Sequence, residues 1–247
     1  MPDLDSCLEI AKSATLLAGN FLKEQQDTNL KILTNKARDL KLQIDIDAEE
    51  IIKEHITANS SLPILAEESG KSGSLDDFFW VVDPLDGTSN FLRNIPISCV
   101  SIGLVQGFKP ILGAIFDFNN SDLYFAHKNS KAYVNKSEIN VSSFNFKKDS
   151  TLVTGIPAKD NYSDDEFSNM ISDFQSWKKV RMIGSAAMAS AYVAAGKAEA
   201  YKENGIFLWD IAAGAAIVEA AGGKVSISNY QPDFRVDAYF ANNNLEK

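Results

Sequence analysis

Apolar residues recur every three or four positions in several stretches of the chain, which is the spacing of one face of a helix. Residues 4–22 follow this period most clearly and predict an amphipathic helix. Residues 27–41 are polar and basic, and we expect a short extended pair around a loop there. Further helices are expected over about 45–57, 164–177, 184–195 and 209–221. Gly196 and Gly222 follow the last two of these segments, as glycine commonly does at a helix C-terminus.

Other segments have the patterns of strands. Residues 78–82 (FFWVV) are continuously apolar and end at Asp83, which is typical of a strand buried on both faces. Beyond Pro96 the chain alternates between apolar and polar residues and is interrupted by Gly, Pro and Asn, which predicts successive antiparallel strands. These strands are expected within 98–107, 109–120 and 122–129, and shorter ones at 62–66, 152–157, 197–201 and 236–243.

The order of these elements predicts a mixed α/β (α+β) chain with antiparallel sheet in the middle and α/β alternation later. No linker rich in Pro, Gly or Ser divides the sequence. We therefore expect residues 1–247 to form one unit, with possible subdomains at 1–140 and 141–247 that share a continuous core.

Charge and composition exclude several classes of protein. With 24 Lys and Arg against 33 Asp and Glu, the net charge is −9, which argues against a partner that is nucleic acid or an anionic membrane. Two Cys and two His leave little for a disulfide framework or a zinc site. The N-terminal residues lack the pattern of a secretory signal, and no apolar run approaches the ~20 residues of a membrane span. We expect a cytoplasmic location.

Carboxylates cluster at three places where a buried element ends or begins: AEES at 66–69, DPLDGTSN at 83–90, and Trp209–Asp210. Each has an ordinary explanation when taken alone, namely a solvated loop end, a turn and a helix N-cap. When several carboxylates converge near the low-dielectric interior, a divalent cation compensates their negative charge at the smallest cost in free energy. A set of Asp and Glu without His or Cys favours Mg²⁺ or Mn²⁺ over Zn²⁺.

The second cluster is the most informative. Pro84 fixes its own φ and is expected to break the strand, so that Asp83 and Asp86 are directed at one point. Gly87 permits close backbone approach, and a helix that begins at Thr88 would present free N–H groups to an anion. Two carboxylates beside such a helix start suit a metal-assisted phosphatase.

These motifs resemble those of a known family. WVVDPLDGTSNF and WDIAAGAAIVEAAGG are similar to the two signatures of the inositol monophosphatase family, and AEES matches its Glu-Glu-Ser segment. The motifs occur in the family's order, and the resemblance covers nearly the whole chain. It implies the layered α/β/α/β/α fold of the sugar-phosphatase superfamily, a homodimer, two or three Mg²⁺ per site and inhibition by Li⁺.

The resemblance also implies roles for individual residues. It assigns the metal ligands to Glu67, Asp83, Asp86, Asp210 and the Leu85 carbonyl. The catalytic residues that it implies are Glu67 and Thr88, which hold the attacking water, and Asp45, which orients the Thr88 hydroxyl. The substrate contacts that it implies are Asp86, Gly87, Thr88, Ala186, Glu203 and Asp210, of which the Gly87 and Thr88 amides cradle the phosphate. Metal ions would activate the water and stabilise the leaving alkoxide.

We therefore expect a Mg²⁺-dependent phosphomonoesterase, with myo-inositol monophosphate as the leading substrate. Glu203, just before the Trp-Asp pair, favours an inositol-like polyol. The alternative substrates are those of a 3′-phosphoadenosine nucleotidase, a fructose-1,6-bisphosphatase or a histidinol-phosphate phosphatase. A regulatory or RNA-associated binding protein is the alternative that is not an enzyme. Of the remaining residues, Cys7 and Cys99 are expected to be small buried hydrophobic residues, His55 to be exposed, and His127 to lie in a loop without a partner.

Overall fold

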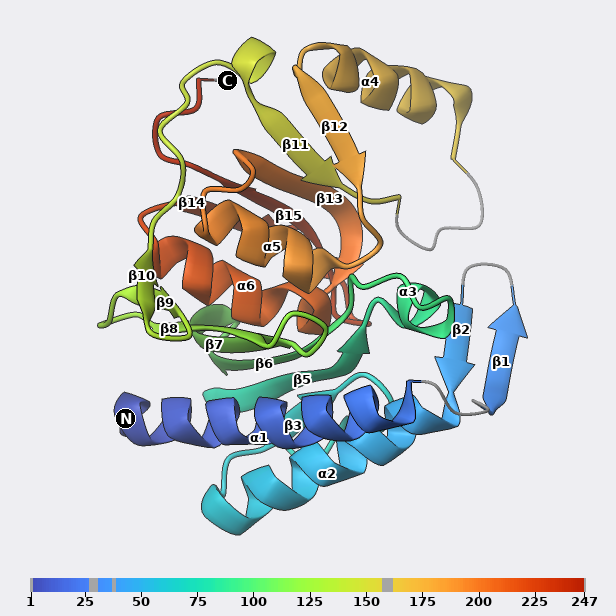
Figure 1. The fold of residues 1–247 in the computed structure, drawn as a ribbon, viewed down its shortest axis with the longest axis vertical. Helices are drawn as coiled ribbons and strands as arrows, with labels where there is room; N and C mark the ends of the chain where they lie inside the picture. The colour runs from blue at the N-terminus through green and yellow to red at the C-terminus, as the bar shows by residue number, and fades with distance from the viewer. Residues whose placement is uncertain (1, 27–30, 37–38, 157–161, 247) are drawn as a thin grey trace.

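The computed structural model describes residues 2–26, 31–36, 39–156 and 162–246. Within these ranges helices and sheets alternate in layers, as Figure 1 shows. Two N-terminal helices cover the larger sheet, two central helices separate it from the smaller sheet, and one further helix lies on the outer side of the smaller sheet. This is the α/β/α/β/α order that the motifs imply.

The first layer consists of α1 (Leu4–Gln25) and α2 (Gln43–Asn59). The Asp3 side chain accepts a hydrogen bond from the Ser6 N–H and so begins α1. One face of α1, including Ala11, Ala18 and Leu22, is fully buried against the larger sheet. Between the two helices, β1 (Ile32–Lys36) and β2 (Asp39–Leu42) form the expected extended pair, whose turn lies outside the described residues.

The larger sheet has eight strands in the order β10-β9-β8-β7-β6-β5-β3-β4, and only the β3–β5 pair is parallel. The predicted antiparallel run beyond Pro96 is confirmed by β6, β7 and β8. The strands are β3 (Ile64–Ala66), β4 (Gly70–Lys71), β5 (Phe78–Asp86), β6 (Cys99–Gln106), β7 (Lys109–Asp117), β8 (Asp122–His127), β9 (Ala132–Val134) and β10 (Ser137–Ile139).

Pro84 does not break β5, and this part of the sequence prediction is wrong. The strand continues to Asp86, and its register against β6 shifts between Asp83 and Asp86. An irregular position of this kind tolerates proline because no ladder hydrogen bond is required from its nitrogen. The shift lies between Asp83 and Asp86, whose charges interact with each other.

The smaller sheet has five strands in the order β12-β11-β13-β15-β14. They are β11 (Thr151–Thr154), β12 (Lys179–Met182), β13 (Ala200–Phe207), β14 (Lys224–Ser228) and β15 (Arg235–Ala241). The sequence did not predict β12 and β14, which are the two edge strands and carry polar residues facing solvent. It placed β13 over 197–201, whereas the strand starts later and extends to Phe207.

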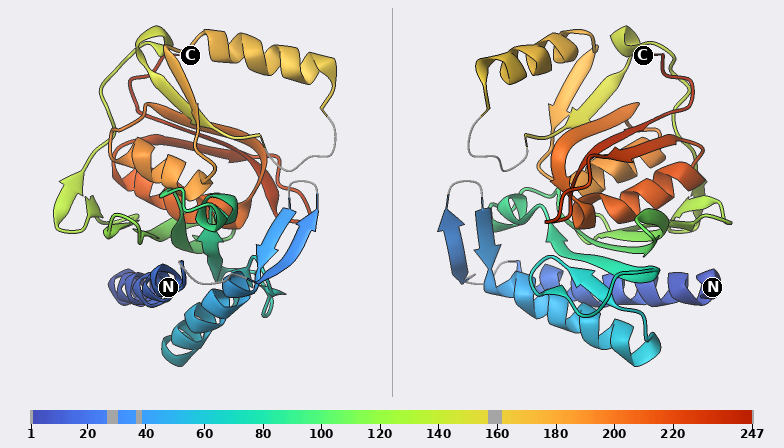
Figure 2. Two further views of the ribbon diagram at one scale, coloured as in Figure 1. Left: turned by 45° about the vertical axis from the view of Figure 1, so that its right-hand side comes forward. Right: turned by 180° about the vertical axis from the view of Figure 1, so that it is seen from behind.

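The central layer consists of α5 (Ala186–Ala194) and α6 (Leu208–Ala220), which lie between the two sheets in both views of Figure 2. Both helices are apolar on all sides, as expected of helices buried on both faces. Gly103 and Gly113 bring β6 and β7 close to α6, because a side chain at either position would collide with Ala212 or Ala213.

The outermost helix is α4 (Asp164–Gln175), and Phe174 at its end packs with Trp177 and Leu152 against the smaller sheet. Ser163 caps α4 by accepting from the Glu166 N–H. No helix within the described residues combines the length and apolar character that a membrane crossing requires.

Candidate active site

The three carboxylate clusters of the sequence meet where β5 ends. Asp83 and Asp86 lie at the end of β5, 1% and 9% exposed. Glu67 follows β3, the parallel neighbour of β5, and its N–H donates to the Val82 carbonyl over 3.1 Å. Asp210 lies in the first turn of α6 and interacts electrostatically with Glu67 and Asp83. Four carboxylates from three distant segments therefore share one region.

These four groups are unfavourable as free anions. Burial is the largest cause that raises the pKa of Glu67, Asp83 and Asp210 well above the ordinary range, and the neighbouring carboxylates raise the pKa of each further. Glu67 and Asp83 relieve part of this repulsion by a hydrogen bond between their carboxyl groups. None of the ion pairs between described residues involves these four side chains. A bound cation would compensate this charge.

Asp86 joins β5 to the central helix layer. Its Oδ2 accepts from the Ser185 hydroxyl over 2.5 Å and from the Ala187 N–H over 2.7 Å, at the N-terminus of α5. Positive charge at that helix end favours the anion. Burial nevertheless outweighs these bonds and raises the pKa of Asp86 to about 6. Ser185 was not singled out in the sequence, although a serine just before a small-residue helix is a recognisable N-cap.

Gly87 begins the short helix α3 (Thr88–Leu92) in a left-handed conformation, with φ of 89°. A Cβ at this position would lie 2.8 Å from the Ile97 carbonyl oxygen, so both the conformation and the space require glycine. Asn90 fixes the same turn, because its side-chain amide donates to the carbonyls of Ile97 and Ile183 over 2.8 and 2.7 Å. This contact holds the start of α3 beside the segment that precedes α5.

Thr88 and Asp45 lie at this site, and each makes a hydrogen bond with the backbone. The Thr88 hydroxyl donates to the Leu85 carbonyl over 3.0 Å, and Asp45 Oδ2 accepts from the Leu42 N–H over 2.7 Å. Asp45 is 2% exposed and raises the pKa of Glu67 through its charge. The Leu85 carbonyl, with two lone pairs, retains the capacity to accept a second partner. The water-orienting roles of Thr88 and Asp45 remain predictions.

Glu203 lies within β13 rather than at its end, and it is 8% exposed. Tyr201 donates its hydroxyl to Glu203 over 3.1 Å, and burial raises the pKa of Glu203 to about 7. Its carboxylate lines a cavity of about 480 Å³ between the smaller sheet and α4, and its charge interacts with that of Asp86. Ala186, the first residue of α5, is 8% exposed. A buried Glu203 beside the carboxylate cluster suits a contact to substrate hydroxyl groups.

The donor atoms fit a hard divalent cation. Carboxylate and carbonyl oxygens are the ligands that Mg²⁺ prefers, and the raised pKa values show that negative charge there lacks compensation. In the described part of the chain, no group of three or more His, Cys, Asp or Glu side chains is arranged closely enough to hold a metal ion as it stands. Glu67 and Asp83 form a hydrogen bond with each other, and binding of a cation would require both carboxyl groups to be ionised.

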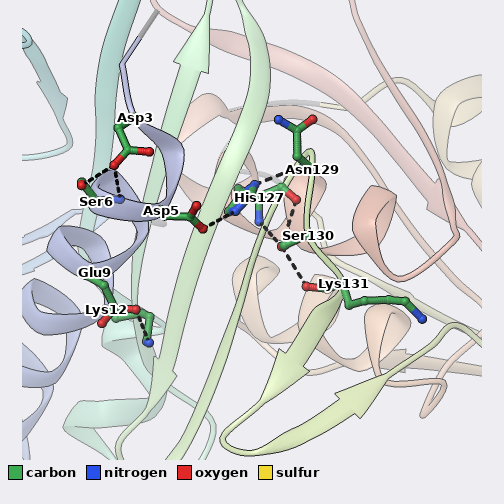
Figure 3. A network of polar contacts seen from close by, with 9 residues as sticks. All are labelled: Asp3, Asp5, Ser6, Glu9, Lys12, His127, Asn129, Ser130 and Lys131. Carbon is green, nitrogen blue, oxygen red and sulfur yellow. Dashed lines mark hydrogen bonds and ion pairs between the residues drawn. The ribbon is translucent and has the colours of Figure 1, made fainter.

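Both histidines lie away from this site and have partners, which corrects the sequence expectation. The Ser13 hydroxyl lies 2.7 Å from His55 Nε2. His127 ends β8 and is 6% exposed; its Nε2 lies 3.1 Å from Asp5 and its Nδ1 accepts from the Asn129 N–H, as Figure 3 shows. These contacts attach α1 to α2 and to β8. Cys7 and Cys99 are buried, as expected.

Comparison with known proteins connects the fold and the site to one family. Residues 3–246 match the model of the inositol monophosphatase family. The inositol-1-monophosphatase of Synechocystis is 39% identical, over 93% of this chain and 82% of its own length. The Nus factor SuhB of Xylella fastidiosa is 36% identical, over 88% of this chain and 80% of its own length. The solved inositol monophosphatase of Anabaena superposes with a TM-score of 0.85 at 33% identity and covers 98% of this chain and 93% of that one.

Proposed function

This chain belongs to the inositol monophosphatase family, and we propose that it is a Mg²⁺-dependent phosphomonoesterase whose leading substrate is myo-inositol monophosphate. The observation that carries the proposal is the convergence of Glu67, Asp83, Asp86 and Asp210, four acidic groups whose pKa values are raised by burial. A cluster of carboxylates can hold metal ions, and the bound ions would then attract an anionic substrate. The relative named inositol-1-monophosphatase supports the same activity.

Two or three Mg²⁺ held by these carboxylates and the Leu85 carbonyl would neutralise the phosphate and lower the pKa of the attacking water. The chain itself orients the reactants. In this proposal Glu67 and the Thr88 hydroxyl would hold the water, and the N–H groups of Gly87 and Thr88, at the start of α3, would bind phosphate oxygens. Phosphoryl transfer depends mainly on such positioning and charge neutralisation, so no covalent nucleophile is needed.

The leaving group is expected to be a small polyol. Glu203 presents a buried carboxylate that accepts from hydroxyl groups and repels a second phosphate. The cavity at Glu203 is lined by Lys202 and Arg235, but Lys202 is paired with Asp173 at 2.8 Å and Arg235 with Asp233 at 2.7 Å. Among the described residues that line the cavity, these pairs leave little positive charge for a bisphosphate, which favours the inositol phosphate over fructose 1,6-bisphosphate.

A panel of phosphate esters tests the proposal. The purified chain is incubated with Mg²⁺ or with EDTA and with myo-inositol 1-phosphate, fructose 1,6-bisphosphate, 3′-phosphoadenosine 5′-phosphate or histidinol phosphate, and released phosphate is measured. We expect Mg²⁺-dependent release, fastest from the inositol ester. Release mainly from another ester would overturn the substrate assignment and leave the phosphatase assignment intact.

The second candidate is a regulatory or RNA-associated binding protein, which the relative named Nus factor SuhB favours. No phosphate release from any ester at any Mg²⁺ concentration would support this candidate and overturn the enzyme proposal. We also expect a homodimer, as in the family, and light scattering during size-exclusion chromatography would measure it.

A further inference from the structure

One face of α2 carries Asp45, Glu49 and Lys53, spaced four residues apart and therefore stacked along the helix. Glu49 is 3% exposed although it is charged. Its two carboxylate oxygens accept from two successive backbone N–H groups, Oε2 from Glu68 over 2.8 Å and Oε1 from Ser69 over 3.0 Å. Hydrogen bonds to an ionised acceptor are the stronger kind, and two of them fix orientation as well as position.

The turn that Glu49 holds is the one that follows β3 and carries Glu67. On the other side, the Glu67 N–H donates to the Val82 carbonyl in β5 over 3.1 Å. Lys53 completes the attachment to α2, because its Nζ donates to the Ser69 hydroxyl over 2.8 Å and lies 3.8 Å from Glu49 Oε1. The backbone that carries Glu67 is therefore fixed between β5 and α2.

Glu67 needs such a restraint. Its carboxyl group faces the charges of Glu68, Asp45 and Asp86, all of the same sign. Ionised carboxylates repel one another, and the repulsion pushes the most weakly held segment away from the cluster. The strand that follows the turn is short, since β4 contributes only Gly70 and Lys71 to the sheet. An anchor on α2 opposes this displacement.

We propose that Glu49 is a positioning residue for the proposed reaction: its carboxylate fixes the turn at residues 67–69 and so holds the Glu67 carboxylate where it binds Mg²⁺. The inference rests on the proposed function only in taking Glu67 as a metal ligand. Glu49 itself touches neither the metal nor the substrate and acts through the backbone of the turn.

Glu49→Gln tests this inference in the full-length chain. The amide keeps the size of the side chain but replaces one accepting oxygen by a donor, so one of the two N–H groups loses its partner. We expect Mg²⁺ affinity, measured by titration calorimetry, to fall about 10- to 100-fold, as is usual when a group that orients a ligand is changed. The Mg²⁺ concentration for half-maximal activity should rise by the same factor, while kcat at saturating Mg²⁺ stays within a few-fold of the original.

Hydrogen exchange in the metal-free protein provides a readout independent of activity. The amides of Glu68 and Ser69 should exchange faster in Glu49→Gln than in the original chain. Glu50→Gln is the matched control, because Glu50 is the next residue of α2 and is exposed; it should change neither exchange nor Mg²⁺ affinity. If Glu49→Gln does not fold, Lys53→Met removes the bond to the Ser69 hydroxyl from a half-exposed position and should weaken Mg²⁺ binding several-fold.

The outcomes separate this inference from the proposed function. Faster exchange at Glu68 and Ser69 with unchanged Mg²⁺ affinity in Glu49→Gln would overturn the positioning role and leave the phosphatase assignment standing. An equal loss in Glu50→Gln would also overturn it, because the effect would then be one of general charge. Absence of Mg²⁺ binding and turnover in the original chain would instead refute the proposed function.

Discussion

The substitution Asp86→Asn separates two effects of the Asp86 carboxylate. One is the free-energy cost of burying its charge, and the other is its proposed role as a metal ligand. In the metal-free protein, burial raises the pKa of Asp86 from 3.8 to about 6, even though Ser185 and Ala187 donate to the carboxylate. The folded chain thus keeps a proton in a range of pH where the unfolded chain has released it. Stability is therefore lost as pH rises from about 4 to about 6, and the loss is complete at pH 8.

The size of this effect follows from the shift. A rise of about 2 pKa units corresponds to about 3 kcal/mol of unfolding free energy at pH 8, at 1.36 kcal/mol per unit. Asparagine carries no charge and avoids this cost, but its amide group loses about 1 kcal/mol in hydrogen bonding. We expect a net gain of about 2 kcal/mol for the metal-free variant, which raises Tm by about 4–8 °C in a chain of this size.

Thermal unfolding at pH 8, with and without Mg²⁺, measures both consequences. Mg²⁺ at about 100 times its Kd should stabilise the original chain by about 2.7 kcal/mol and the variant very little. Turnover in the variant should fall at least about 100-fold. A metal-free variant that melts below the original chain would refute the reasoning about buried charge. A variant that keeps its Mg²⁺-induced Tm shift and its turnover would show that Asp86 is not a ligand.

Three further predictions follow from other residues and from the family. Because burial raises the pKa of Glu203 to about 7, metal-free stability should fall between about pH 4.5 and 7, by about 3 kcal/mol, and Glu203→Gln should remove that part of the pH dependence in urea unfolding at pH 5 and 8. An unchanged pH dependence would contradict this assignment. Gly87→Ala should lower the free energy of unfolding by about 1–3 kcal/mol, since φ is 89° and the new Cβ meets the Ile97 carbonyl; a wild-type Tm would refute this. Li⁺ should inhibit Mg²⁺-dependent phosphate release, and full activity in Li⁺ would argue against the inositol phosphatase assignment.

The strongly periodic parts of the sequence predicted the fold well. The three-to-four-residue spacing of α1 and the small-residue composition of α5 and α6 identified these helices within a few residues of their ends. The apolar run at residues 78–82 identified the first part of β5 for the same reason, since a strand segment buried on both faces is apolar at successive positions. In these segments burial alone determines the residue types, so the pattern is unambiguous.

The edge strands β12 and β14 could not be predicted from pattern. KVRM and KVSIS are short and carry charged or hydroxyl side chains because one side of each strand has no neighbour. Glu203 illustrates the same difficulty. A glutamate in a polar run indicates a solvent-facing position, whereas Glu203 is buried in β13, which pairs with β11 on one side and β15 on the other.

The candidate site was predictable where its residues lie at the ends of buried elements. Asp83, Asp86 and Asp210 occupy such positions, and the structure brings them together. Glu49 was missed because a glutamate on a helix normally faces water, and the two N–H groups that it binds lie about 20 residues away along the chain. Partners so distant in sequence are set by the packing of α2 against the turn after β3.

In the proposed enzyme, carboxylates from three segments of this chain form one divalent-metal site. Anomalous diffraction from crystals soaked in Mn²⁺ tests it most directly, because Mn²⁺ takes the same oxygen ligands as Mg²⁺ and scatters anomalously. We predict anomalous peaks within bonding distance of Glu67, Asp83, Asp86 and Asp210, and their loss in Asp86→Asn crystals. Peaks elsewhere, or none among these four residues at saturating Mn²⁺, would contradict the account.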